Sequence, residues 1–204
     1  AEHPNMYIVS DEIYEHLNFN GKHESISQFD FIKNQVIIIN GVSKAYAMTG
    51  WRIGYMAAPE WIAKACKKLQ GQTTSNACSI AQKAAEAALN HPTNLFKENN
   101  AILLERRDVL AAALNEIPGL KFIVPDATFY IFPDISAYYG KSDGTYKIID
   151  SRSMSMYLLE KAQVAVVAGS AFGSDECIRI SFTVGCEKLK EAVKRIKEAL
   201  AKLH

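Results

Sequence analysis

The chain has 204 residues, 49% of them hydrophobic, and a formal net charge of +1 at pH 7. This length suits one large domain or two small ones. The near-neutral charge, without a basic stripe or a run of like charges, argues against nucleic acid as a partner. Because no apolar run is long enough to span a bilayer, we also expect no membrane partner, and small molecules are the expected ligands.

Cysteine and histidine spacing excludes two further kinds of site. The four cysteines form no CxxC pair, so we expect reduced thiols in a cytoplasmic protein. The five histidines are scattered without ligand spacing, and we therefore predict no metal site.

The first predicted element is a short buried strand over residues 7–10. It is followed at once by Asp11 and, three residues later, by Tyr14. A carboxylate and a phenol would thus lie at the carboxyl end of a strand, the edge where open α/β sheets bind ligands.

A second apolar run, residues 36–39, predicts a buried parallel strand. Lys44 follows in a loop, and Arg52 comes eight positions later. The pair offers an amine nucleophile and a planar cation suited to phosphate, which together suggest an anionic carbonyl ligand. The alternative is that both are ordinary solvated loop charges. Two adjacent parallel strands would bring Asp11 and Tyr14 beside Lys44.

The next elements are a strand and two helices. We predict a third strand over 53–58, a helix opened by Pro59, a polar connection over 70–75 with capping residues up to Asn76, and an alanine-rich helix through Leu89. The first helix has an apolar face formed by Trp61, Ile62, Ala65, Cys66 and Leu69.

The pattern breaks near residues 90–93, where we place a domain boundary. A long helix follows, with an apolar stripe that runs from Leu95 to Leu114. The remainder predicts a compact α/β unit with strands at 121–124, 129–132, 164–167 and 178–183, a helix at 153–162 and an amphipathic terminal helix.

Strand alternation separates two faces in residues 177–184. Arg179 falls on the outward face, together with Cys177, Ser181 and Thr183, whereas Ile178, Ile180, Phe182 and Val184 face the core. By itself this pattern fits an exposed strand arginine as well as a ligand-binding one.

Three motifs closely resemble the class I and II aminotransferases of the fold-type I pyridoxal-phosphate enzymes. They are Ser10-Asp11-Glu12-Ile13-Tyr14, then Ser43-Lys44 with Gly50-Trp51-Arg52-Ile53-Gly54, and finally Ile178-Arg179-Ile180-Ser181-Phe182. The sequence between these motifs is most similar to that of the bacterial aspartate aminotransferase branch.

The resemblance implies a role for each matched residue. Lys44 would form the internal aldimine with pyridoxal 5'-phosphate and shuttle the substrate proton. Asp11 would face the pyridine nitrogen, Tyr14 the phenolic oxygen, Arg52 the phosphate, and Arg179 the α-carboxylate of the substrate.

Near Lys44 the chain departs from the family pattern. Many relatives carry a serine three residues before the lysine, where this chain has Gly41. Ser43, adjacent to Lys44, is the substitute candidate for a phosphate contact.

The resemblance also implies a fold. It is α/β, the carboxyl-terminal half of a pyridoxal-phosphate-dependent transferase, because the chain begins without Met shortly before a core strand and the motifs belong to the second half of the family. Residues 1–91 would form the carboxyl-terminal part of the large, cofactor-binding domain, with part of its sheet, and residues 92–204 would form the small domain.

The expected function is transfer of an amino group between an aspartate-like or aromatic L-amino acid and 2-oxoglutarate. A lyase or synthase of the same fold would use the same residues. A catalytically inactive fragment, acting only as a folded interaction or dimerisation unit, is a third reading. Strand edges left open in a half-length chain predict a homodimer or other self-association.

Overall fold

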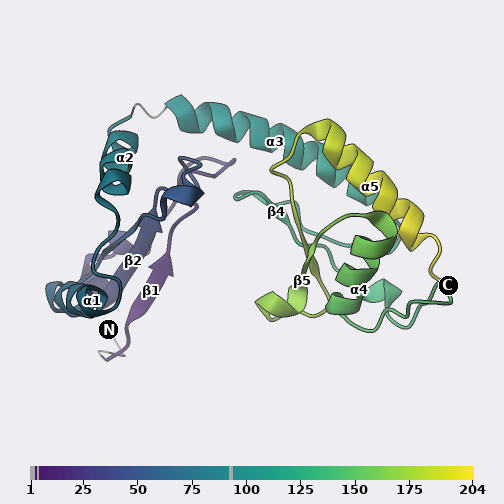
Figure 1. Cartoon of the computed structure of the whole chain (residues 1–204), viewed down its shortest axis with the longest axis horizontal. Coiled ribbons are helices and arrows are strands. Elements are labelled where there is room, and N and C mark those ends of the chain that lie inside the picture. Colours follow the sequence, from purple (N-terminus) through teal and green to yellow (C-terminus); the bar gives the residue numbers. More distant parts are fainter. Residues whose placement is uncertain (1–2, 4, 92–93) are drawn as a thin grey trace. The chain divides into compact units, whose positions relative to one another are not determined.

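The computed structural model describes residues 3, 5–91 and 94–204 and divides into two compact units, residues 1–97 and 98–204. Each unit combines helices with a small three-stranded sheet, so the predicted α/β class is confirmed (Figure 1). The expected boundary between 91 and 92 stays a prediction, because residues 92 and 93 lie outside the described part. No helix of the described residues is both long and apolar enough to cross a membrane.

The sheet of the first unit has the order β1–β2–β3, with β1 at Ile8–Asp11, β2 at Val36–Gly41 and β3 at Gly54–Ala57. β1 and β2 are parallel, as the sequence predicts, and Asp11 pairs with Ile39. β3 runs antiparallel to β2, with Gly54 opposite Gly41. The carboxyl ends of β1 and β2 and the amino end of β3 therefore share one edge.

Two helices follow β3 and lie beside this sheet, α1 (Glu60–Thr73) and α2 (Ser79–Leu89). The predicted polar connection over 70–75 is right only for residues 74 and 75, because α1 continues to Thr73. The glutamines of this segment are good helix formers on a solvated surface. The predicted caps are wrong as well, since the N-cap of α2 is Cys78. The predicted apolar face of α1 is not a core face, because Trp61 is 60% and Leu69 67% exposed.

The second unit is built on a wholly antiparallel sheet of order β4–β6–β5. Its strands are β4 (Tyr130–Ile131), β5 (Val167–Ala168) and β6 (Ile178–Ser181). The helices are α4 (Ser151–Tyr157), which continues as a π-helical turn to Ala162, α5 (Cys186–Leu200), and α3 (Asn94–Asn115), which enters from the first unit.

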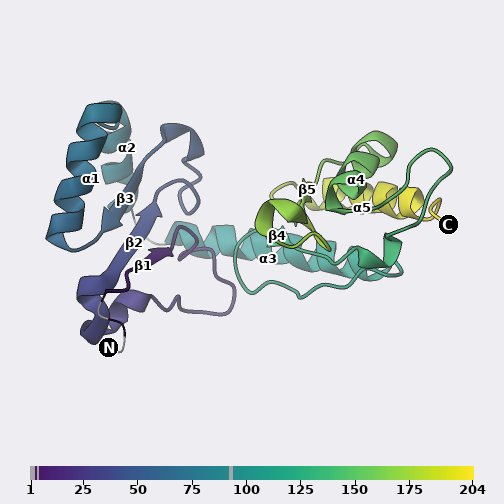
Figure 2. The same cartoon turned by 90° about the horizontal axis from the view of Figure 1, so that it is seen from below.

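The core of the second unit lies between this sheet and its helices. α3 and α5 run side by side (Figure 2), and an ion pair of 2.9 Å joins Glu116, just after α3, to Lys197. The predicted apolar stripe of the terminal helix is confirmed. Large buried side chains of this core are Leu110, Leu114, Ile131, Tyr157, Phe182, Leu189, Val193, Ile196 and Leu200.

Two predicted strands of this unit need correction. Residues 121–124 form only one isolated bridge, Lys121 with Asp134, and Ile123 is 89% exposed. The apolar run between Pro118 and Pro125 therefore does not form a strand, because no partner strand pairs with it along its length. The strand expected at 164–167 shrinks to Val167–Ala168, because the π-helical turn ends in a left-handed residue, Gln163.

Candidate active site

Asp11 is the last residue of β1 and lies at the shared edge of the first sheet. Its side chain is exposed, and Oδ1 accepts a hydrogen bond of 3.2 Å from the backbone N–H of Ile13. This local turn keeps the chain at the end of the strand as it runs on to Tyr14.

The neighbouring Glu12 is buried, 6% exposed, and its carboxylate lies in a network that sequence reasoning missed. The hydroxyls of Ser10 and Ser25 donate to it at 3.1 and 2.9 Å, and Nε2 of His23 lies 3.1 Å away. Burial raises the pKa of the Glu12 carboxyl, but the hydrogen bonds from Ser25, His23 and Ser10 outweigh this effect and leave the pKa below its ordinary value. The network ties the loop before Ser25 to the end of β1.

Lys44 lies three residues after the end of β2, in a tight turn. Its side chain is half-buried, and Nζ lies 5.9 Å from the centroid of the Tyr14 ring, which is also half-buried. This contact is within cation–π range. The structure thus brings together Lys44 and Tyr14, two residues 30 positions apart that the parallel-strand argument places side by side.

Gly41 is held in place by the close approach of two strands. A Cβ at this position would lie 2.8 Å from the carbonyl oxygen of Ile53 and 3.1 Å from Cα of Gly54. A serine would therefore fit here only if the backbone shifted. Ser43 lies half-buried beside Lys44.

Arg52 sits two residues before β3, and so at the same edge as the ends of β1 and β2. Its backbone is left-handed, with φ of 57°, an uncommon conformation for a side-chain-bearing residue. The exposed guanidinium donates a hydrogen bond of 3.0 Å to the carbonyl of Thr49. A carboxylate, a phenol, an amine and a guanidinium therefore gather at one sheet edge of the first unit.

Arg179 belongs to the second unit, on the central strand β6. The predicted alternation is confirmed for Ile178, Ile180 and Phe182, which are buried, while Arg179 is only partly exposed. Val184, expected to face the core, is 44% exposed because β6 ends at Ser181.

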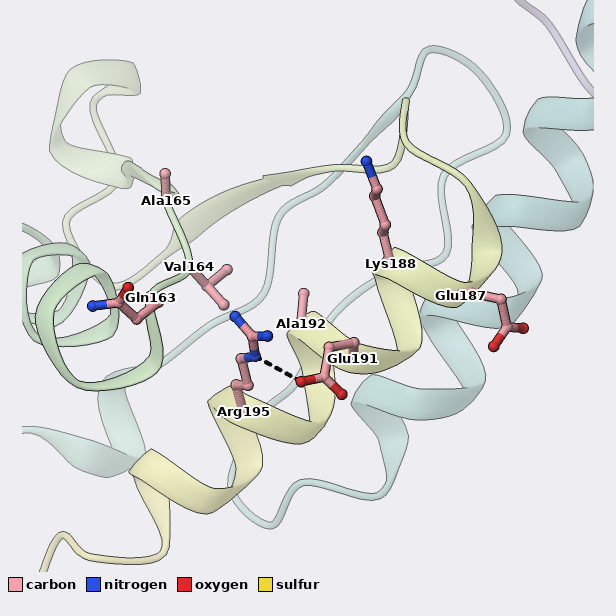
Figure 3. Close-up of a pocket in the computed structure, with 8 residues that line it drawn as sticks. All are labelled: Gln163, Val164, Ala165, Glu187, Lys188, Glu191, Ala192 and Arg195. Carbon is pink, nitrogen blue, oxygen red and sulfur yellow. Dashed lines mark hydrogen bonds and ion pairs between the residues drawn. The ribbon is translucent and has the colours of Figure 1, made fainter.

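A groove of the second unit contains none of the six predicted site residues. It lies between the chain before β5 and the first half of α5 (Figure 3), where Arg195 reaches back to Glu191 at 2.7 Å. Both charged groups of this pair are about half exposed, and such pairs contribute little binding or stability.

Comparison with known proteins gives consistent matches. Residues 1–196 match the family model described as aminotransferase class I and II. Over 98% of its length, the chain is 46% identical to the bifunctional aspartate aminotransferase and glutamate/aspartate-prephenate aminotransferase of Petunia hybrida, of which it covers 43%. The aspartate aminotransferase of Bacillus subtilis is 45% identical, with 97% of this chain and 50% of that protein covered.

Solved structures give the same picture. The aspartate aminotransferase of Rhizobium meliloti superposes with a TM-score of 0.93 at 41% identity. The superposition covers all of this chain and 52% of the Rhizobium meliloti chain. The aromatic aminotransferase of Pyrococcus horikoshii gives a TM-score of 0.87 at 36% identity. This superposition covers 98% of this chain and 52% of the Pyrococcus horikoshii chain. The chain spans about half the length of these relatives.

Proposed function

Because the chain belongs to the class I and II aminotransferases, we propose that it carries the catalytic lysine of a pyridoxal-phosphate-dependent aminotransferase. The observation that carries the proposal is the convergence of Asp11, Tyr14, Lys44 and Arg52 on one sheet edge. We use the term complete enzyme for an aminotransferase of the relatives' full length that contains residues 1–204.

The residues at this edge match the functional groups of pyridoxal phosphate, which members of this family use. The amine of Lys44 suits the aldehyde, the guanidinium of Arg52 suits the phosphate, and the carboxylate of Asp11 suits the protonated pyridine nitrogen. The phenol of Tyr14 suits the phenolic oxygen. When bound, the cofactor supplies an electron sink that stabilises negative charge at the substrate Cα.

The protein's own contribution is binding and proton transfer. The half-buried Lys44 amine, placed against the Tyr14 ring, would take the proton from the substrate Cα and pass it, within the same half-reaction, to the former aldehyde carbon of the cofactor. Arg52 would bind the phosphate through its N–H groups, and Ser43 is a further candidate for that contact.

The proposed substrates are an aspartate-like or aromatic L-amino acid and 2-oxoglutarate. Both reactants carry a carboxylate next to the reacting carbon, and Arg179 would bind it with two parallel hydrogen bonds. Support for the aspartate-like choice comes from the relatives, whose names include aspartate and prephenate aminotransferases.

We also propose a cytoplasmic homodimer. Its four cysteines are free thiols, as expected in a reducing compartment. Several large apolar side chains of the first unit are more than 60% exposed, a surface that association would cover.

The test is transfer of ¹⁵N from labelled aspartate to 2-oxoglutarate by the complete enzyme. Lys44→Ala is expected to lower the rate by about a thousandfold or more. It removes a general base, which contributes roughly 10²–10⁴-fold to the rate, and it also removes the amine to which the cofactor would be attached. Lys68→Ala, on the exposed surface of α1, is the matched control and should keep the rate. Near-normal transfer in Lys44→Ala would refute the proposal, and side-chain loss without amino transfer would favour a lyase.

A further inference from the structure

Two aromatic rings lie against the guanidinium of Arg179. Its Cζ atom is 4.3 Å from the ring centroid of Tyr130 and 4.4 Å from that of Phe172. Contacts this short are well inside the cation–π range. Together the two rings restrict the rotamers open to a long and otherwise flexible side chain.

Strand register accounts for the Tyr130 contact. In the antiparallel pair of β4 and β6, Tyr130 lies opposite Ser181. Arg179, two residues from Ser181, is on the same face and is the diagonal neighbour of Tyr130, a distance that aromatic and long side chains bridge.

A closed turn on the other side of β6 accounts for the Phe172 contact. Val167 of β5 pairs with Arg179, and the chain then enters the 3₁₀ turn Gly169–Phe172. The N–H of Gly169 donates to the carbonyl of Cys177 at 2.8 Å, and a Cβ on this glycine would be only 2.2 Å from that oxygen. Only glycine permits this approach, which fixes the turn beside Arg179.

A buried serine holds the same turn from the side of α4. The hydroxyl of Ser151, which is fully buried, donates to Asp175 at 2.6 Å and accepts from the N–H of Ser170 at 3.1 Å. Phe172 nevertheless remains 49% exposed. The turn therefore presents this ring at the surface in a fixed position rather than burying it in the core.

We propose that Phe172 is a positioning residue for carboxylate binding: with Tyr130, it pre-orders the Arg179 guanidinium so that its N–H groups meet a carboxylate. The inference rests on the proposed function, in which Arg179 binds the carboxylate shared by amino acid and 2-oxo acid. Within the described second unit no carboxylate pairs with Arg179, which leaves its N–H groups for a ligand. Pre-ordering strengthens binding by lowering the entropy lost on complex formation.

The test compares Phe172→Leu with Phe172→Tyr and with Phe122→Leu in the complete enzyme. Phe122 is a half-buried phenylalanine of the same unit, and no cation–π contact joins it to Arg179 among the described residues. Phe172→Leu is expected to raise KM for both aspartate and 2-oxoglutarate by about two- to fivefold, the range of a solvent-exposed cation–π contact. The kcat should change less than about twofold, and Phe172→Tyr should restore both KM values.

Arg179→Leu separates failure of this inference from failure of the proposed function. If Arg179→Leu leaves both KM values unchanged, Arg179 does not bind the carboxylate, and the assignment underlying both proposals is lost. If Arg179→Leu raises both KM values while Phe172→Leu behaves like Phe122→Leu, only the role of Phe172 is overturned. A fall in kcat and melting temperature of Phe172→Leu without a KM change would also overturn it, since that result marks a purely structural residue.

Discussion

The Nζ atom of Lys44 lies 5.9 Å from the centroid of the Tyr14 ring, so the loops that follow β2 and β1 meet at these two side chains. The contact depends on the parallel pairing of the two strands, in which Asp11 is opposite Ile39. Because both loops start from this common edge, a change in strand register would separate the amine from the phenol.

The Glu12 network gives a prediction about acid stability. The carboxylate accepts hydrogen bonds that hold its pKa below the ordinary glutamate value of 4.5 in the folded state. A group of this kind stabilises the fold above its unfolded pKa, and the contribution is lost as the pH falls through the folded pKa.

Glu12→Gln is therefore expected to lower the free energy of unfolding at pH 7 by about 1–3 kcal/mol, the usual cost of disrupting a buried hydrogen-bonded group. Its stability should also fall less than that of the natural protein between pH 6 and pH 3. Urea unfolding across this pH range measures both effects. Glu24→Gln, an exposed position in the same loop, is the control, and equal pH slopes for all three proteins would contradict the role of Glu12.

Gly41 gives a prediction about backbone packing. Gly41→Ser places a Cβ 2.8 Å from the carbonyl oxygen of Ile53, so the strands must move apart. We expect a loss of about 1–3 kcal/mol in unfolding free energy, as for other overpacked sites. Gly50→Ser has no atom within 4 Å of its Cβ and serves as the matched control in the same denaturation assay. Equal stability of the two variants would show that the strand approach tolerates a side chain.

The exposed apolar face of the first unit predicts self-association of the 204-residue chain. Leu69 is 67% exposed on α1, and Ile80 is 71% exposed on α2. Leu69→Glu should shift sedimentation toward monomer, because a charge at an apolar contact costs desolvation energy. Gln72→Glu adds the same charge at an exposed position of the same helix and should leave the distribution unchanged. A natural chain that sediments as a monomer at high concentration would rule out this association.

Patterns within one element were predictable from the sequence, and contacts between distant segments mostly were not. The apolar runs predict β1 and β2, and alternation predicts the inward face of Ile178 and Ile180. The run at 121–124 is also largely apolar but lacks a partner strand, which no local pattern reveals.

The candidate site divides in the same way. The positions of Asp11, Tyr14 and Lys44 follow from strand ends, whose edge is set by parallel pairing. The Glu12 network was not predictable, because Ser25 lies 13 residues away in a loop without periodicity. The ring of Phe172 reaches Arg179 only through a turn whose closure depends on a buried serine and a glycine, and neither carries a local signal.

The most direct test of a cofactor site at Lys44 is to mix the purified chain with pyridoxal phosphate, reduce the mixture with borohydride, and map modified lysines by peptide mass. Reduction fixes the cofactor on whichever amine it has joined. We expect modification concentrated at Lys44 and its loss in Lys44→Ala, with Lys68→Ala unchanged. Modification spread evenly over exposed lysines, or absent altogether, would contradict the claim that residues 1–204 carry a cofactor site at Lys44.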